Sequence, residues 1–218
     1  MSVGKFLHDN AGSVIIEYTL VFPLFIVALL GTVDVTYMLF EWVTANKTTY
    51  IGARTAVVSD PVAIGITTPI YTQTQLQQLG QACSNSLNGA ANGNCPSMNT
   101  VCDGASSICT NGFKWNETAF SAIFTAMQAM FPRLARENVQ ITYQTNNLGY
   151  VGQTSPTSPG GLPLNVTVSI RCLTHRFYFI EALTNWIFSP PAGCSNNLLG
   201  PAIPSFASTL QGESLATN

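Results

Sequence analysis

Residues 13–33 read SVIIEYTLVFPLFIVALLGTV, and this stretch decides the fold. Sixteen residues without a charged side chain separate Glu17 from Asp34. A helix over 13–33 is about 31 Å long, which matches the hydrocarbon thickness of a bilayer. The run lacks a small-residue cleavage site of the A-x-A kind, so a secretory signal is not expected. We predict one transmembrane helix; a helix buried in a soluble core is the alternative.

The helix is expected to continue well beyond the apolar run. Pro23 removes a backbone N–H donor, which predicts a kink near Leu20. After Asp34, residues at three- and four-residue spacing indicate an amphipathic continuation: Val35, Leu39, Trp42, Tyr50, Ala53 and Val57. Pro61 disfavours helical geometry at Asp60, so the predicted helix, 14–59, is about 69 Å long.

Composition excludes one class of function and favours a membrane-associated protein. Charged residues make up 8% of the chain, with 8 basic and 10 acidic side chains. No basic stripe is available to neutralise phosphates, so nucleic acid is not an expected partner. With 24 Thr, 17 Ser and 17 Asn, the polar surface consists mainly of uncharged groups, which suits an extracytoplasmic face.

Six cysteines lie in the C-terminal two thirds of the chain, and none forms a C-x-x-C pair. Their spacing fits neither a zinc site nor a thioredoxin-like centre, and an even number predicts disulfides in an oxidising compartment. Reduced buried thiols are the alternative. We expect Cys172–Cys194 first and Cys102–Cys109 next, which leaves Cys83 and Cys95, although fifteen pairings are possible.

The remainder of the chain predicts an α+β head. Helices are expected over 74–87, over 117–131 with Asn116 as the N-cap, and over 177–188. The last helix either covers the sheet or contacts another subunit or the membrane surface. Residues 83–112, rich in Asn, Gly and Ser, are predicted as a loop region. Alternating apolar residues predict antiparallel strands around 139–143 and 164–170, with a third strand near 205–210.

Catalytic motifs are not found in the sequence, which contains no G-x-S-x-G, H-E-x-x-H or glycine-rich phosphate loop. His175, beside Arg176, is interpreted as a surface or strand-end residue. We therefore expect a protein that is not an enzyme and needs no cofactor or metal.

One motif gives a family resemblance. Gly12-Ser13-Val14-Ile15-Ile16-Glu17-Tyr18 has the form G-x-x-x-x-E-Y before an apolar helix, and it resembles the processing site of prepilins of the tight-adherence (Tad, or Flp) pilus. The stretch 17–54, with Pro23, Gly31, Asp34 and Gly52-Ala53-Arg54, is similar to TadE/TadF-like pseudopilins of that machine.

The resemblance implies roles for the motif residues. A prepilin peptidase would cut between Gly12 and Ser13, leaving the Ser13 amine as a new N-terminus. One helical turn separates positions 13 and 17, so this amine lies within reach of Glu17 in the same or a neighbouring chain. The alternative is that Glu17 is an interfacial carboxylate stabilised by the helix dipole and water.

The predicted organisation follows from these points. Residues 1–12 are a prepilin-type leader, 13–59 a transmembrane and stalk helix, and 60–218 the disulfide-stabilised head. We expect a structural minor pilin in the bacterial inner membrane, with its N-terminus in the cytoplasm and its head in the periplasm. Its expected partners are the prepilin peptidase, other pilins, the Tad assembly platform and the bilayer. The alternative is an unprocessed single-pass anchor whose head binds an envelope partner.

Overall fold

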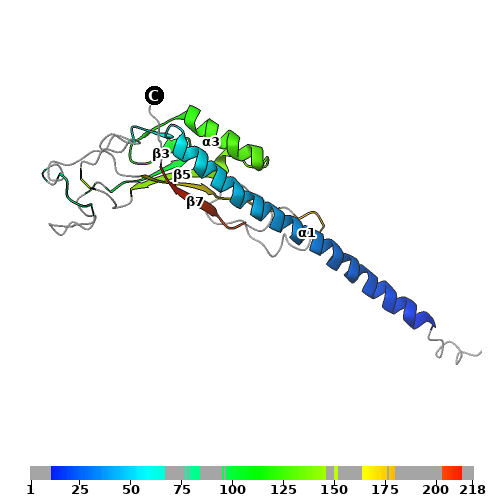
Figure 1. Cartoon of the computed structure of the whole chain (residues 1–218). Coiled ribbons are helices and arrows are strands. Elements are labelled where there is room, and N and C mark those ends of the chain that lie inside the picture. The colour runs from blue at the N-terminus through cyan, green and yellow to red at the C-terminus, as the bar shows by residue number, and fades with distance from the viewer. Residues whose placement is uncertain are drawn as a thin grey trace, which may run out of the picture. The chain divides into compact units, whose positions relative to one another are not determined.

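The computed structural model describes most of the long helix and the sheet (Figure 1). The described residues are 11–66, 77, 79–83, 95, 97–145, 150–151, 164–175, 177–179 and 203–212, with side chains from residue 15 onward. The chain forms two compact units. The anchor unit contains 1–41 and 174–203, and the sheet unit contains 42–173 and 204–218.

A single helix, α1 (Ala11–Val58), contributes residues to both units. Its 48 residues span about 72 Å at 1.5 Å per residue, close to the predicted length. Pro23 lies inside this continuous helix. The helix ends two residues before the Asp60–Pro61 bond, where proline restricts the preceding residue.

The sheet unit is built around a five-stranded antiparallel sheet with the order β3-β2-β5-β6-β7. The strands are β2 (Asn99–Asp103), β3 (Ile108–Cys109), β5 (Val139–Thr145), β6 (Leu164–Ile170) and β7 (Phe206–Gln211). A second, two-stranded sheet pairs β1 (Ala63–Ile64) with β4 (Lys114–Trp115). The two strands predicted from alternation are β5 and β6, the third predicted strand is β7, and the α+β class is confirmed.

One face of the sheet is buried beneath two helices. Gly52 of α1 lies close to Val168 of β6 and to Met127 of α3 (Glu117–Met130), so both helices belong to this face. The Tyr143 hydroxyl from β5 accepts the Val62 N–H at 2.9 Å. The buried apolar side chains of this core include Phe120, Ile123, Met127, Val139, Ile141, Tyr143, Val166 and Val168.

Small residues form the face of α1 that enters this core. Ala45, Thr48, Thr49, Gly52, Ala53 and Ala56 are buried, whereas Trp42 and Tyr50 are exposed. The predicted apolar stripe was therefore right at Ala53 and Val57 and wrong at its large members. Small side chains let the helix axis approach the sheet. The side chains of Met127 and Val168 fill the space next to Gly52.

Helix α3 begins and ends as its sequence predicts. The Asn116 side chain accepts the Ala119 N–H at 3.2 Å, an N-cap, and Pro132 follows the C-terminal Phe131. Buried Phe120, Ile123 and Met127 lie on one side of the helix. A short 3-10 helix, η2 (Arg136–Asn138), connects this region to β5.

Two local predictions were wrong. Residues 79–83, predicted as helix, form a turn and an isolated bridge between Ala82 and Tyr150; Gly80 has φ +83° and donates to the Val151 carbonyl. The region 83–112, predicted as a loop, contains β2 and β3. The backbone groups of β2 are satisfied by pairing with β5, a long-range contact that local composition does not reveal.

The described disulfides join Cys83 to Cys95 and Cys102 to Cys109. The second is a pair that the sequence favoured, and its two cysteines are register partners of β2 and β3. Cys172 is also disulfide-bonded. Its predicted partner, Cys194, lies outside the described residues. So do residues 74–76, 78 and 84–87 of the helix predicted over 74–87, and residues 180–188 of the helix predicted over 177–188. Residues 177–179 are not helical.

Candidate functional site

The N-terminal part of α1 presents an apolar surface to its surroundings. The most apolar 18-residue window of 15–58 has a mean hydropathy of 2.0, and none of it is buried within the chain. By its length and composition, this helix could cross a membrane. Its exposed large side chains include Ile15, Ile16, Tyr18, Leu20, Val21, Phe22, Leu24, Phe25, Val27, Leu29 and Val33. Burial of such side chains in lipid or against another helix is strongly favourable, at about 25 cal/mol per Å² of apolar surface.

Hydroxyl groups in this apolar stretch are satisfied within the helix. Thr19 donates to the Ile16 carbonyl, Thr32 to Leu29 and Thr36 to Thr32, at 2.7–2.9 Å. Such internal bonds allow threonine to lie in a hydrocarbon environment, where backbone and hydroxyl groups find no water. These three threonines therefore do not oppose insertion.

The predicted processing residues lie at the start of α1. Gly12 and Ser13 fall within its first turn, and Glu17 follows about one turn later. The first turn of a helix lacks intrahelical partners for its N–H groups, so it opens more readily than the interior. Glu17 and Tyr18 are exposed, and the Tyr18 ring stacks on Phe22 with centroids 5.5 Å apart.

Two buried carboxylates on α1 hold a distant segment of the anchor unit. Asp34 is 1% exposed and accepts the backbone N–H groups of Tyr178 and Phe179 at 3.2 and 2.9 Å. Glu41 is 3% exposed, and its Oε2 lies 2.6 Å from Nδ1 of His175, which is fully buried. Because both acids have polar partners, their burial does not leave an isolated charge.

Helical spacing places these acids on one face with an aromatic side chain between them. Asp34, Tyr37 and Glu41 are separated by three and four residues. The Tyr37 ring lies 5.8 Å from the His175 ring and 5.7 Å, edge-on, from that of Tyr178. We call His175, Phe177, Tyr178 and Phe179, together with this face of α1, the acid clasp.

The position of His175 corrects its interpretation from the sequence. It is not a surface residue, because its ring is enclosed by Glu41, Tyr37 and Phe177, the last at 5.0 Å. Nε2 of this ring is buried and has no hydrogen-bond partner among the described residues. The signal that sequence reasoning missed was the pair of acids inside an apolar helix, since buried acids require a partner.

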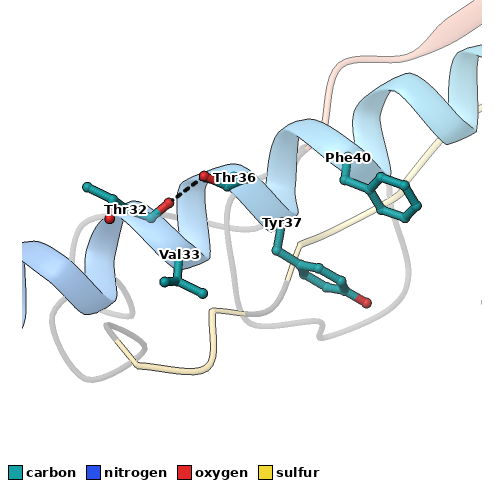
Figure 2. A pocket seen from close by; sticks show the side chains of 5 residues that line it. All are labelled: Thr32, Val33, Thr36, Tyr37 and Phe40. Carbon is teal, nitrogen blue, oxygen red and sulfur yellow. Dashed lines mark hydrogen bonds between the residues drawn. The ribbon is translucent and has the colours of Figure 1, made fainter.

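A shallow hollow of about 420 Å³ lies along the same helix, lined by Thr32, Val33, Thr36, Tyr37 and Phe40. Figure 2 shows Val33 and Tyr37 pointing to the same side of α1 and the Thr36 hydroxyl bonded to the Thr32 carbonyl. With the threonine hydroxyls occupied internally, this surface is mainly apolar. No cluster of three or more His, Cys, Asp or Glu suited to a metal occurs within the described ranges.

A charged pair with aromatic support lies in the sheet unit. Arg136 donates to both carboxylate oxygens of Glu117, and the Trp115 indole N–H also donates to Glu117. The hydrogen bonds from Arg136, and then from Trp115, lower the pKa of Glu117 to about 2. Burial raises the pKa of Tyr143, partly opposed by the bond from Val62.

Comparison with known families identifies the helical segment. Residues 12–54 match the model of the family described as TadE-like protein. Comparisons with curated proteins and with solved structures gave no match. The matched segment contains Gly12, Glu17, Asp34, Glu41 and Arg54, and it implies a protein associated with the Tad pilus.

Proposed function

We propose that this TadE-like chain is a minor pilin, or pseudopilin, of a Tad pilus and that its role is structural rather than catalytic. The observation that carries the proposal is the coincidence of the family match, 12–54, with a helix surface that the chain itself leaves exposed. A surface of this kind needs lipid before assembly, and in a filament the apolar helices of neighbouring pilins replace the lipid.

We infer the orientation from the disulfides of the sheet unit. The sheet unit contains Cys83–Cys95 and Cys102–Cys109, which persist in an oxidising compartment such as the periplasm. Residues before α1 then lie in the cytoplasm, where a membrane peptidase meets the Gly12–Ser13 bond. The first helical turn is the part of α1 that opens at least cost, which suits cleavage at that bond.

The proposal separates two steps that use different residues. Gly12 serves cleavage, since a residue without a side chain leaves the backbone accessible to the peptidase. Glu17 serves assembly, because its carboxylate compensates the new Ser13 amine of its own or a neighbouring chain at the membrane edge. Other pilins and the assembly platform are the proposed partners.

The acid clasp supports a structural role for the segment just after the apolar run. The carboxylate of Glu41 binds His175, and that of Asp34 binds the backbone of Tyr178 and Phe179. This part of α1 therefore holds a segment that is distant in sequence. An enzyme would instead be expected to present such groups to a substrate. The buried pair of His175 and Glu41 is therefore assigned a structural role.

Cell fractionation tests the proposal. We compare wild type, Gly12→Val and the control Gly4→Val, which makes the same change inside the leader but away from the scissile bond. Wild type and Gly4→Val should yield a shortened chain in membranes and in sheared pili, whereas Gly12→Val should remain full-length in membranes. A full-length wild-type chain in every fraction contradicts the proposal and favours the unprocessed anchor.

A further inference from the structure

The second face of the five-stranded sheet carries a regular array of uncharged polar side chains. Strand register aligns one row of four carboxamides across four strands: Asn99, Gln144, Asn165 and Gln211. The next row is Val101, Thr142, Thr167 and Thr209, in which the last two hydroxyls are 2.8 Å apart. All eight side chains alternate with the core residues, so they lie on the face opposite α1 and α3, half-buried or exposed.

A hollow of about 450 Å³ lies at the β2 end of the carboxamide row. It is lined by Ser97, Met98, Asn99, Asn111, Gln144 and Thr145. Its volume falls within the range of sites for small ligands, about 300–1,000 Å³. The lining contains no charged side chain.

Some of these groups build the wall of the hollow, and others are available to a ligand. Asn111, at φ 61°, donates both amide hydrogens, to the Asn99 carbonyl and to Thr100 Oγ1. Thr145 accepts the Met98 N–H at 2.9 Å. The side chains of Ser97, Asn99 and Gln144 have no hydrogen-bond partner among the described residues, so their donors and acceptors point to a ligand that offers both.

A charged residue on the same face of the described sheet lies in a different row. Asp103 opposes Gln140 in the register of β2 and β5. Their row is next to the threonine row, on the side away from the carboxamide row. Asp103 pairs with Arg171 at 3.5 Å. A charged ligand would therefore find no opposite charge in the hollow. The two rows offer a protein partner none of the aromatic or arginine anchors that dominate protein interfaces, and Val101 is their only apolar residue.

We propose that this face binds a neutral oligosaccharide, with Asn99, Gln144 and Ser97 as its anchoring hydrogen-bond partners. Sugar hydroxyls donate and accept, as carboxamides and hydroxyls do, and they carry no charge. Carboxamides on neighbouring strands, about 4.8 Å apart, give successive sugar units similar partners. The site is independent of cleavage after Gly12, so it is tested on the uncut chain.

Binding is measured with the full chain in phospholipid nanodiscs, which avoids detergents with sugar headgroups. The probes are cellohexaose, maltohexaose, hexa-N-acetylchitohexaose and a heparin hexasaccharide. Saturation-transfer NMR detects their binding, and calorimetry measures their affinity. At least one neutral hexasaccharide should bind wild type. The double variant Asn99→Ala/Gln144→Ala should weaken its affinity by about tenfold or more, because several hydrogen bonds are lost.

Controls distinguish the site from general effects. Gln128→Ala removes an exposed glutamine of α3, on the other side of the sheet unit, and should bind as wild type does. If the double variant does not fold, Gln211→Lys, at the far end of the carboxamide row, replaces it and should also weaken binding. The proposal is overturned if no neutral hexasaccharide binds or if only the heparin probe binds. It is also overturned if the wild type and the row variants bind with equal affinity. A row variant that alters self-association but not saccharide binding overturns it in favour of a protein interface.

Discussion

The carboxylate of Asp34 accepts two backbone N–H groups at a position where the helix leaves its apolar run. Hydrogen bonds to a charged acceptor contribute about 1.5–3 kcal/mol, more than those between neutral groups. Both bonds lie on consecutive amides, those of Tyr178 and Phe179. The acid clasp is therefore held by a small number of strong interactions, and single substitutions should loosen it.

The first prediction concerns Asp34→Asn. The substitution removes the charge and one of the two acceptor oxygens, so the amides of Tyr178 and Phe179 should exchange with deuterium about tenfold faster or more. Amide exchange followed by mass spectrometry measures the effect. The exposed Asp60→Asn is the matched control, and unchanged exchange at 178–179 in Asp34→Asn contradicts the clasp.

The second prediction concerns how the unfolding temperature changes at acidic pH. The pKa of Glu117 is lowered from 4.5 to about 2, so its ionised form stabilises the fold above pH 4.5, and this stabilisation is lost as pH falls toward 2. The unfolding temperature should fall less steeply between these pH values in Glu117→Gln than in wild type. Arg136→Gln removes the principal cause and should flatten the profile similarly. Parallel profiles for all three chains contradict the assignment.

At the scale of elements, close approach of backbone explains which glycines matter. A Cβ on Gly104, after β2, would lie 2.3 Å from the Arg136 carbonyl and 2.9 Å from that of Val139. A Cβ on Gly52 would meet the flexible end of Met127 at 2.6 Å. Backbone atoms cannot move aside as a methionine side chain can, so the two sites differ despite similar crowding.

The third prediction follows from this difference. Gly104→Ala should lower the free energy of unfolding by about 1–3 kcal/mol, the usual cost of overpacking. Gly52→Ala should cost less, because alanine gains about 1 kcal/mol of helix propensity over glycine. Chemical denaturation of both variants measures the effect, and an equal or greater loss for Gly52→Ala contradicts this account.

How well each element could be predicted depends on where its hydrogen bonds are made. Helix α3 has its cap, Asn116, and its stop, Pro132, in the local sequence, so both ends were predictable. The strands β5 and β6 alternate for seven residues each. By contrast, β2 is five residues long and draws its stability from pairing with β5, some forty residues away in sequence. No local pattern carries that information.

The same reasoning applies to the candidate site. The motif Gly12 to Tyr18 and the apolar run are local signals, and they were sufficient for the family prediction that the match over 12–54 confirms. The partners of Asp34 and Glu41 are about 140 residues away, so sequence spacing could not identify them. The need for partners was nevertheless predictable from two acids within a helix of this kind.

At the scale of the whole molecule, the fourth prediction separates processing from assembly. Glu17→Ala should leave cleavage intact but reduce the amount of chain recovered in sheared pili at least several-fold, since the Ser13 amine loses its compensating carboxylate at the membrane edge. Thr19→Ala, a neighbouring exposed position, is the control. Immunoblots of membrane and pilus fractions measure both outcomes. Loss of cleavage in Glu17→Ala would place this residue in peptidase recognition instead.

The most direct test of the central claim, that the chain is a processed pseudopilin, is the mass of its N-terminal peptide in native membranes. Cleavage by the prepilin peptidase predicts a peptide that begins at Ser13 with a free or N-methylated amine, together with an intact chain shorter by residues 1–12. An intact chain of 23.3 kDa that retains Gly12 and the preceding residues would contradict the claim.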